Sequence, residues 1–134
     1  MKLSVYLNYA GTCEAAFRFY EQHLGGRITS MMRHSELPQS GVPEEFRNGI
    51  LHARIEIGGM LLMGSDIPSA QPVRSAYLSL AVDSAEEAER LYTLLAEDGE
   101  VFMAIHETFF ASRFAQLRDR FGTSWQLMHE RPRA

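Results

Sequence analysis

The feature of this sequence that most constrains its fold is a tandem repeat. Residues 4–20 return in altered form at residues 75–92, with Glu14, Arg18 and Tyr20 echoed by Glu86, Arg90 and Tyr92. Each copy opens with a short run of alternating apolar and polar residues, passes a turn signal, and continues as an amphipathic helix that ends at glycine. A strand followed by a helix, twice, with a period near 72 residues, predicts two related supersecondary units rather than a solenoid.

The chain length limits how these units can be organised. Two independent cores within 134 residues would each have about 65 residues, near the lower limit at which a chain buries enough surface to fold alone. We therefore predict a single domain over 1–134, built of a first module at 1–67 and a second at 75–130. The proline-containing residues 66–74 are predicted to link the two modules.

Charge and cysteine content exclude several classes of partner. A net charge of −4 without a basic stripe argues against nucleic acid as the partner. No apolar run approaches the roughly 20 residues of a membrane helix, and the N-terminus has no signal-peptide pattern, so a cytoplasmic location is expected. The single cysteine, Cys13, is expected to pack as a small apolar residue; a reactive thiolate at a helix N-terminus is the alternative.

Periodicity predicts the same element order, βαβββ, in both copies. The helices follow Thr12, a candidate N-cap, and Ser84, which with Glu87 forms a candidate capping box. Gly58 and Gly59 predict a hairpin. The predicted strands are 3–9, 27–34, 50–57 and 60–65 in the first copy, and 75–82, 101–106, 113–118 and 123–129 in the second. The first copy also carries about nine extra residues, in the segment 35–47, which is either a tolerated surface loop or a flap over a binding cleft.

Four motifs occur in a fixed order along the chain. They are Phe19-Tyr20 in the first helix, His52-Ala-Arg-Ile-Glu-Ile-Gly-Gly-Met-Leu-Leu-Met-Gly-Ser-Asp66, Glu107-Thr-Phe-Phe, and Arg120-Phe-Gly-Thr-Ser-Trp125. In this order and spacing they resemble the PhnB-like branch of the glyoxalase/bleomycin-resistance (vicinal oxygen chelate) superfamily. The resemblance covers essentially the whole chain. It implies an α+β fold in which two βαβββ modules form a curved mixed-sheet cleft with the helices outside, and it implies a homodimer.

The resemblance also implies where a metal ion would be held. In metal-dependent members, ligands from the first and fourth strands of each copy hold a divalent metal, and counting from the motifs places these positions on Val5, Met63, Tyr77 and Gln126. Valine has no donor, methionine suits only soft metals, neutral tyrosine is a poor ligand, and one glutamine cannot replace a set of histidines and carboxylates. We therefore expect no metal and no other cofactor. A divalent metal held by Gln126 with histidines elsewhere is the alternative.

The histidines offer few other sites. His34 and His106 end the second strands of the two copies and, with Glu107, could build a metal site unlike that of the family. His52 differs from them because it lies in mid-strand on one polar face with Arg54 and Glu56. This face is either exposed with paired charges, or a recognition set in which Arg54 binds an anionic group and His52, the candidate catalytic residue, moves a proton.

Strand parity predicts an apolar pocket floor with a few hydroxyls and one amide. Its expected residues are Val5, Leu7, Met63, Ser65, Tyr77, Ser79, Gln126 and Met128. Such a floor suits a small, partly aromatic or aliphatic ligand held by shape and one or two hydrogen bonds. By the same parity, Trp125, Tyr6 and Leu78 are expected to point toward the helices.

Other functional motifs are absent from the sequence. It has no glycine-rich phosphate loop, no H-E-x-x-H and no G-x-S-x-G. Members of this branch sometimes carry a ubiquinone-related methyltransferase label, but no strand here runs into the glycine-rich turn that a nucleotide-like cofactor favours. The expected function is binding of a small molecule without the family metal. A metal-dependent or histidine-based lyase, isomerase or dioxygenase is the alternative, so the sequence leaves open whether the protein is an enzyme.

Overall fold

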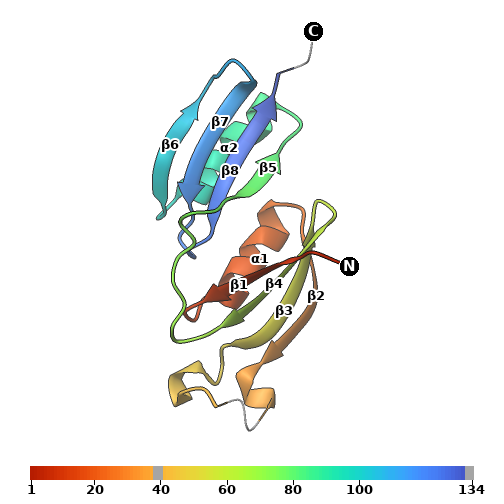
Figure 1. Cartoon of the computed structure of the whole chain (residues 1–134), viewed down its shortest axis with the longest axis vertical. Coiled ribbons are helices and arrows are strands. Elements are labelled where there is room, and N and C mark those ends of the chain that lie inside the picture. The colour runs from red at the N-terminus through yellow and green to blue at the C-terminus, as the bar shows by residue number, and fades with distance from the viewer. Residues whose placement is uncertain (38–40, 132–134) are drawn as a thin grey trace. The chain divides into compact units, whose positions relative to one another are not determined.

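The computed structural model describes residues 1–37 and 41–131 and divides into two compact units, Met1–Gln71 and Pro72–Ala134 (Figure 1). The elements of the first unit are β1 (Val5–Tyr9), α1 (Cys13–His23), β2 (Arg27–Arg33), the 3₁₀ turns η1 (His34–Glu36) and η2 (Glu44–Phe46), β3 (Ile50–Ile57) and β4 (Met60–Asp66). Those of the second unit are β5 (Leu78–Ala81), α2 (Ala85–Ala96), β6 (Glu100–His106), β7 (Ala111–Arg118) and β8 (Ser124–Glu130).

The predicted order βαβββ is confirmed in both units. The strand at 50–57 has the predicted bounds, and Gly58 and Gly59 turn the chain between β3 and β4 with φ of 56° and 81°. The largest difference is β5, which begins at Leu78 instead of residue 75. The preceding residues 75–77 belong to no strand.

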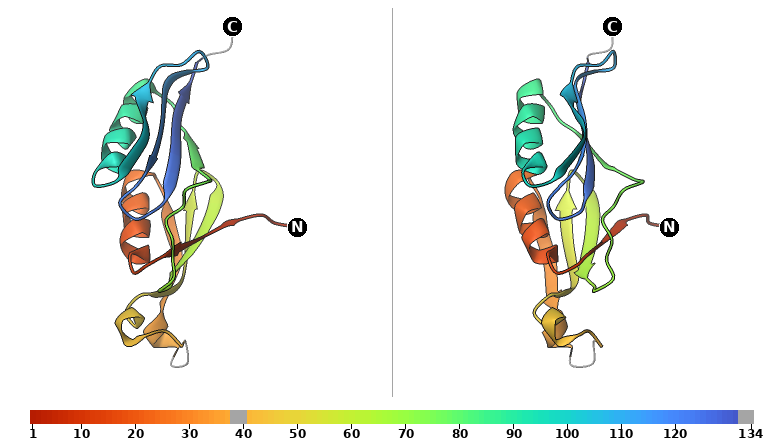
Figure 2. Two further views of the ribbon diagram at one scale, coloured as in Figure 1. Left: turned by 60° about the vertical axis from the view of Figure 1, so that its left-hand side comes forward. Right: turned by 90° about the vertical axis from the view of Figure 1, so that its left-hand side faces the viewer.

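The two sheets have the same topology. Their strand orders are β1-β4-β3-β2 and β5-β8-β7-β6, with the first and fourth strands of each unit parallel and the other pairs antiparallel. Each helix lies along one face of its own sheet (Figure 2). The other face of each sheet, here called the open face, is not covered by the helix of that unit.

In the first unit, α1 packs through aromatic side chains onto small and branched residues of the sheet. Phe17 and Tyr20 are fully buried, as are Ala53 and Ile55 of β3. The approach is closest at Gly64 of β4, where a Cβ atom would lie 2.9 Å from the Phe17 ring. A side chain at this position would therefore push the helix away from the sheet.

In the second unit, α2 packs through leucines onto the only tryptophan of the chain. Leu91 and Leu95 are buried, and so are Trp125 and Leu127 of β8. The Trp125 indole N–H donates a hydrogen bond to the carboxylate of Asp119, 2.8 Å away. The prediction that Trp125 belongs to the helix side of the sheet is confirmed.

The two helices are capped differently at their N-termini. Ser84 accepts a hydrogen bond from the backbone N–H of Glu87, 3.0 Å away, as the sequence predicted for α2. The prediction for α1 was wrong, because the Thr12 side chain makes no capping hydrogen bond. The Asp66 carboxylate accepts from Cys13 N at 2.9 Å instead, so a residue distant in sequence satisfies this helix end.

Asp66 connects three segments of the first unit. Its carboxylate is buried and also accepts from Gly11 N at 3.0 Å and from Ile50 N at 2.8 Å. It thereby ties the β1–α1 turn and the start of β3 to the end of β4. The sequence prediction that Asp66 begins a linker was therefore wrong, because it is the last residue of a core strand.

The inserted segment between β2 and β3 is anchored at its base. His34 N and Ser35 N donate to Gly49 O at 3.0 Å and Arg47 O at 2.8 Å. The segment forms the two 3₁₀ turns, while Pro38 and its neighbours at 39–40 lie outside the described residues. Whether it serves as a loop or a flap stays a prediction.

Two side chains that the sequence left ambiguous are part of this core. Cys13 is fully buried, and burial, with a smaller contribution from the Asp66 carboxylate, raises the pKa of its thiol far above the ordinary value. Cys13 therefore packs as an apolar residue, as expected. His34 is also buried, with its Nε2 atom 2.9 Å from the backbone oxygen of Asp66.

Neither of the two described helices has the length and apolar character needed to cross a membrane.

We expect Asp66→Ala to lower the free energy of unfolding by about 3 kcal/mol, because it leaves the backbone N–H groups of Gly11, Cys13 and Ile50 without their buried acceptor. Urea denaturation followed by circular dichroism measures the change. Asp83→Ala, which removes an exposed aspartate, is the control and should change stability by less than about 0.5 kcal/mol. Equal effects of the two substitutions would contradict the role assigned to Asp66.

Candidate functional site

The pairing register shows which residues of the two units correspond. Val5 pairs with Leu62 in the first unit, and Leu78 pairs with Trp125 in the second. Leu62 and Trp125 are 63 positions apart, as are the turn glycines Gly59 and Gly122. Val5 therefore corresponds to Leu78 and not, as predicted, to Tyr77. The opening strands of the two units are thus offset by 73 residues rather than 72.

This shift of one residue reverses the predicted faces in β1. Leu7 is buried on the helix side, and Val5 has the same parity. Tyr6 is 47% exposed and pairs with Met63 on the open face. The predictions that Val5 and Leu7 share a face with Met63, and that Tyr6 points toward the helix, were wrong, because successive side chains of a strand alternate between faces.

The open face of the first sheet carries most of its polar side chains in pairs. The Tyr6 hydroxyl lies 3.2 Å from His52 Nδ1, and an Arg54 N–H donates to the Met63 sulfur at 3.6 Å. The Ser65 hydroxyl donates to the side-chain oxygen of Asn8 at 3.1 Å.

Glu56, the third member of the predicted polar set, is occupied by Arg27 at 2.8 Å. This ion pair lies beside the β3–β4 hairpin, in a cavity of about 590 Å³ lined by Gly25, Arg27, Glu56, Gly58, Gly59 and Leu61. His52, Arg54 and Glu56 thus share the open face as predicted, but Glu56 is already neutralised by its partner.

The open face of the second sheet has an amide network at its centre. Gln126 of β8 donates to the Ser79 hydroxyl at 3.3 Å and accepts from the Gln116 side chain at 3.1 Å. Ser79 and Gln126 are register partners, so they lie together as predicted. Tyr77 precedes β5, and its ring lies edge-on to Phe102 with the ring centres 6.4 Å apart.

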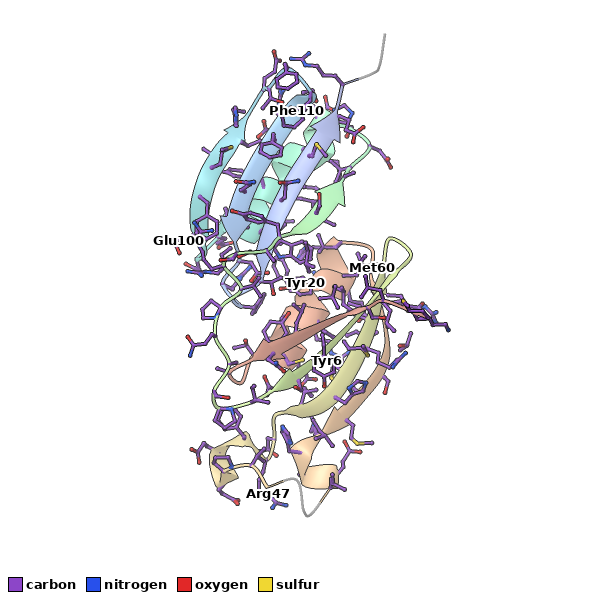
Figure 3. All side chains as sticks on the ribbon, viewed as in Figure 1. Tyr6, Tyr20, Arg47, Met60, Glu100 and Phe110 are labelled. Carbon is purple, nitrogen blue, oxygen red and sulfur yellow. The ribbon has the colours of Figure 1, made fainter. Side chains whose placement is uncertain are left out.

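A cavity of about 610 Å³ lies at the β6–β7 end of this face. Its lining consists of aromatic and apolar side chains with three polar groups: Phe109, Phe110, Phe114, Gln126, Met128, Glu130 and Arg131. Gln126 therefore connects the amide network to the cavity, which we call the aromatic pocket. Figure 3 shows Phe110 at this end of the second sheet.

The aromatic rings of the pocket stack edge to face. The ring centres of Phe109 and Phe110 are 5.2 Å apart, as are those of Phe110 and Phe114, with interplanar angles of 83° and 78°. Phe109 is 93% exposed, whereas phenylalanine side chains are usually buried in folded proteins. This arrangement presents ring faces and edges on which a flat apolar group can stack.

The loop that carries the two exposed rings is fixed to Arg131, the residue that follows β8. Arg131 pairs with Glu107 at 2.6 Å, donates from its side chain to Thr108 O at 2.9 Å, and donates from its backbone to Phe110 O at 3.1 Å. The Thr108 hydroxyl accepts from the backbone N–H groups of Phe110 and Ala111. The side chains of Arg131 and Thr108 thus hold this loop in place.

Sequence reasoning missed the aromatic half of this pocket. The signal was present in Glu107-Thr-Phe-Phe, but a strand predicted to begin at residue 113 left Phe109 and Phe110 in an unassigned connection. In the structure β7 begins at Ala111, directly after them. The pairing of Phe114 with Met128, which completes the pocket, is set by register and is not visible in either strand alone.

The family metal ion does not fit the residues present. After the register is corrected, the strand positions implied for metal ligands carry Tyr6 and Met63 in the first unit, and Ser79 and Gln126 in the second. These are neutral phenol, thioether, hydroxyl and amide groups, with no imidazole or carboxylate. The Arg54 guanidinium beside the Met63 sulfur also opposes a second positive charge there.

The remaining histidines do not form a metal cluster in the described part of the chain. Within residues 1–37 and 41–131, no group of three His, Cys, Asp or Glu side chains is arranged to hold a metal ion. His106 Nδ1 lies 2.9 Å from the backbone oxygen of Ala104, and its ring stands edge-on to Phe114.

Comparison with protein families identifies relatives along the whole chain. The model of the family described as 3-demethylubiquinone-9 3-methyltransferase matches residues 1–128. Protein YjdN of Escherichia coli K12 is 34% identical over 139 aligned positions, which cover 95% of this chain and 94% of YjdN.

Solved structures show the same fold. PA1353 from Pseudomonas aeruginosa superposes with a TM-score of 0.83 at 38% identity, covering 98% of this chain and 99% of that one. A PhnB protein from Bacillus cereus gives 0.82 at 25% identity, with 96% and 99% covered. FosX from Listeria monocytogenes, solved with Mn(II) and sulfate, gives 0.62 at 12% identity, with 98% and 93% covered, and shares the fold alone. The predicted glyoxalase/bleomycin-resistance fold is confirmed.

We expect Arg131→Met to speed amide hydrogen exchange in the 107–110 loop by about tenfold, because it removes the ion pair and the side-chain hydrogen bond that hold this loop. Global stability should fall by less than about 1 kcal/mol, since the broken pair is exposed. Exchange measured by mass spectrometry tests this. Arg27→Met, which breaks the exposed pair with Glu56, is the control; if both substitutions left the loop unchanged, Arg131 would not fix the pocket.

Proposed function

This chain belongs to the 3-demethylubiquinone-9 3-methyltransferase family, in the PhnB-like branch of the glyoxalase/bleomycin-resistance superfamily, and from that premise we propose that it binds a small molecule on the open face of its second sheet without a metal ion. The observation that carries the proposal is the aromatic pocket with Gln126 at its inner edge. Its volume lies within the range usual for small-molecule sites.

The composition of the pocket indicates the kind of ligand. Three phenylalanine rings and Met128 offer apolar contact on several sides. Gln126 can donate or accept a hydrogen bond, although reaching it would displace part of its contacts with Ser79 and Gln116. A ligand with a flat aromatic or aliphatic body and one hydrogen-bonding group matches this arrangement. Of the residues expected from sequence on the pocket floor, Gln126 and Met128 line the aromatic pocket. Ser79 contacts Gln126, whereas Tyr77 lies against Phe102 outside the lining.

The methyltransferase description of the family receives no support from the strand-to-helix turns. A nucleotide-like cofactor is typically held by free backbone donors at a helix N-terminus after a glycine-rich turn. In α1 the backbone N–H groups of Gly11 and Cys13 are taken by the Asp66 carboxylate, and in α2 the N–H of Glu87 is taken by Ser84. At each turn, backbone donors are therefore already taken by acceptors of the chain itself.

A histidine-based reaction on the first sheet is a weaker alternative. His52 would act as the base, but its Nδ1 is engaged by the Tyr6 hydroxyl and Arg54 is directed at Met63. The cavity beside this set contains Glu56 and Arg27, which neutralise each other. Neither His52 nor Arg54 lines that cavity, so the second sheet offers the better site.

The proposal includes a homodimer in the cytoplasm. Large apolar side chains such as Tyr6, Met32 and Phe109 remain exposed in the single chain, which favours association. The single buried cysteine needs no oxidising compartment. Light scattering after size exclusion should give twice the 15.2 kDa mass of the chain; a monomer at micromolar concentration would contradict the dimer.

We expect small aromatic amides and acids to raise the melting temperature of the protein by several degrees, because a ligand at a hundred times its Kd stabilises the folded state by about 2.7 kcal/mol. Phe110→Ala should abolish this shift by removing the central ring of the pocket. Met60→Ala, at another exposed apolar side chain, is the matched control and should preserve the shift. If ligands shifted both variants equally, they would bind elsewhere, and the pocket assignment would fail.

A further inference from the structure

An arginine-aromatic cluster lies at the other end of the second sheet. The guanidinium carbon of Arg74 is 4.1 Å from the centre of the Phe102 ring, and that of Arg118 is 5.6 Å from the same centre. Tyr77 stands edge-on to this ring. Both guanidinium groups therefore lie within 6 Å of the centre of one ring.

The cluster has an uncompensated positive charge. Arg118 pairs with Glu100 at 2.6 Å. Among the described residues of this unit, no carboxylate lies within ion-pair distance of Arg74. Two cations and one carboxylate around a single ring leave one positive charge in excess, which an added anion would compensate.

The geometry leaves hydrogen-bond donors free for such an anion. A guanidinium stacked on a ring presents its N–H groups around its edge, in the fork that matches carboxylate or phosphate oxygens. The backbone beside Arg74 is fixed, because Val73 N donates to Gly122 O at 2.9 Å and Val73 O accepts from the Ser124 hydroxyl. The chain segment that carries Arg74 is thus fixed before any ligand arrives.

The cluster and the aromatic pocket share one face. Phe114, Gln116 and Arg118 alternate along β7, where the register with β8 is regular, so all three point to the open face. Phe114 and Arg118 are four positions apart, which is about 13 Å along the strand. Figure 3 shows Phe110 and Glu100, one beside each site, at opposite ends of the second sheet.

We propose that Arg74 and Arg118 form an anion subsite on Phe102, and that the ligand is an elongated molecule with an aromatic group at one end and a carboxylate, phosphonate or phosphate at the other. The aromatic half rests on the proposed function of the pocket. The anion half stands on the cluster itself. The central amides of Gln116 and Gln126 lie between the two ends and can bind a polar group in the middle of the ligand.

The test is an NMR titration of the ¹⁵N-labelled chain with three probes: phenylpentanoate, the neutral phenylpentanamide of the same shape, and inorganic phosphate. At low salt we expect the acid to bind about tenfold more tightly than the amide, and added salt to weaken the acid only. Phosphate alone should shift the side-chain Nε–H signals of Arg74 and Arg118. Arg74→Gln should abolish the preference for the acid while the amide binds as before.

Arg27→Gln makes the same charge change on the first unit and should preserve the preference. Equal weakening of the acid by both substitutions would mean a general charge effect and would overturn the subsite. Equal affinities of acid and amide, with unmoved arginine signals in phosphate, would overturn the subsite and leave the pocket standing. Shifts of Arg74 in phosphate without binding of either aromatic compound would overturn the pocket and the elongated ligand but keep the subsite.

Discussion

The structure depends on the packing of a single helix against one face of each sheet. Phe17 and Tyr20 in the first unit, and Leu91 and Leu95 in the second, bury the helix-facing residues of their strands. One helix cannot cover two faces, so every second side chain of each strand is left on the open face. The alternation that stabilises the core thus also selects which residues are available for binding.

Buried polar residues fix the pairing register of the strands, and the register determines which side chains lie on the open face. Asp66 ties the β1–α1 turn and the start of β3 to the end of β4, and so supports the parallel register of β1 on β4. In the second unit, Asp119 accepts from Thr123 N and from the Trp125 indole, which holds the turn that leads into β8. Buried carboxylates with several donors are costly to lose, and each of these stands where two strands must meet in register.

The sequence predicted the fold better than the site, for a physical reason. Helices and strands follow from local periodicity, and both βαβββ units were predicted with small errors at their ends. The site depends on which residues of distant strands lie side by side. An offset of 72 rather than 73 was enough to place Val5 where Tyr6 lies, while Ser79 and Gln126 were placed correctly because their parity did not depend on that offset. Phe109 and Phe110 lie in a connection, where no periodicity operates.

Binding through a metal and binding through aromatic contact limit affinity in different ways. A metal concentrates binding in a few strong bonds, whereas apolar contact scales with area at about 25 cal/mol per Å². An aromatic group that covers about 150 Å² against Phe110 and Phe114 would gain about 4 kcal/mol, and association itself costs at least that much. Tight binding therefore requires either a charged contact or cover over the exposed side of the ligand. This is why the surplus charge beside Phe102 matters. It is also why Phe109, the most exposed of the three pocket rings at 93%, would gain from a ligand or partner that covers it.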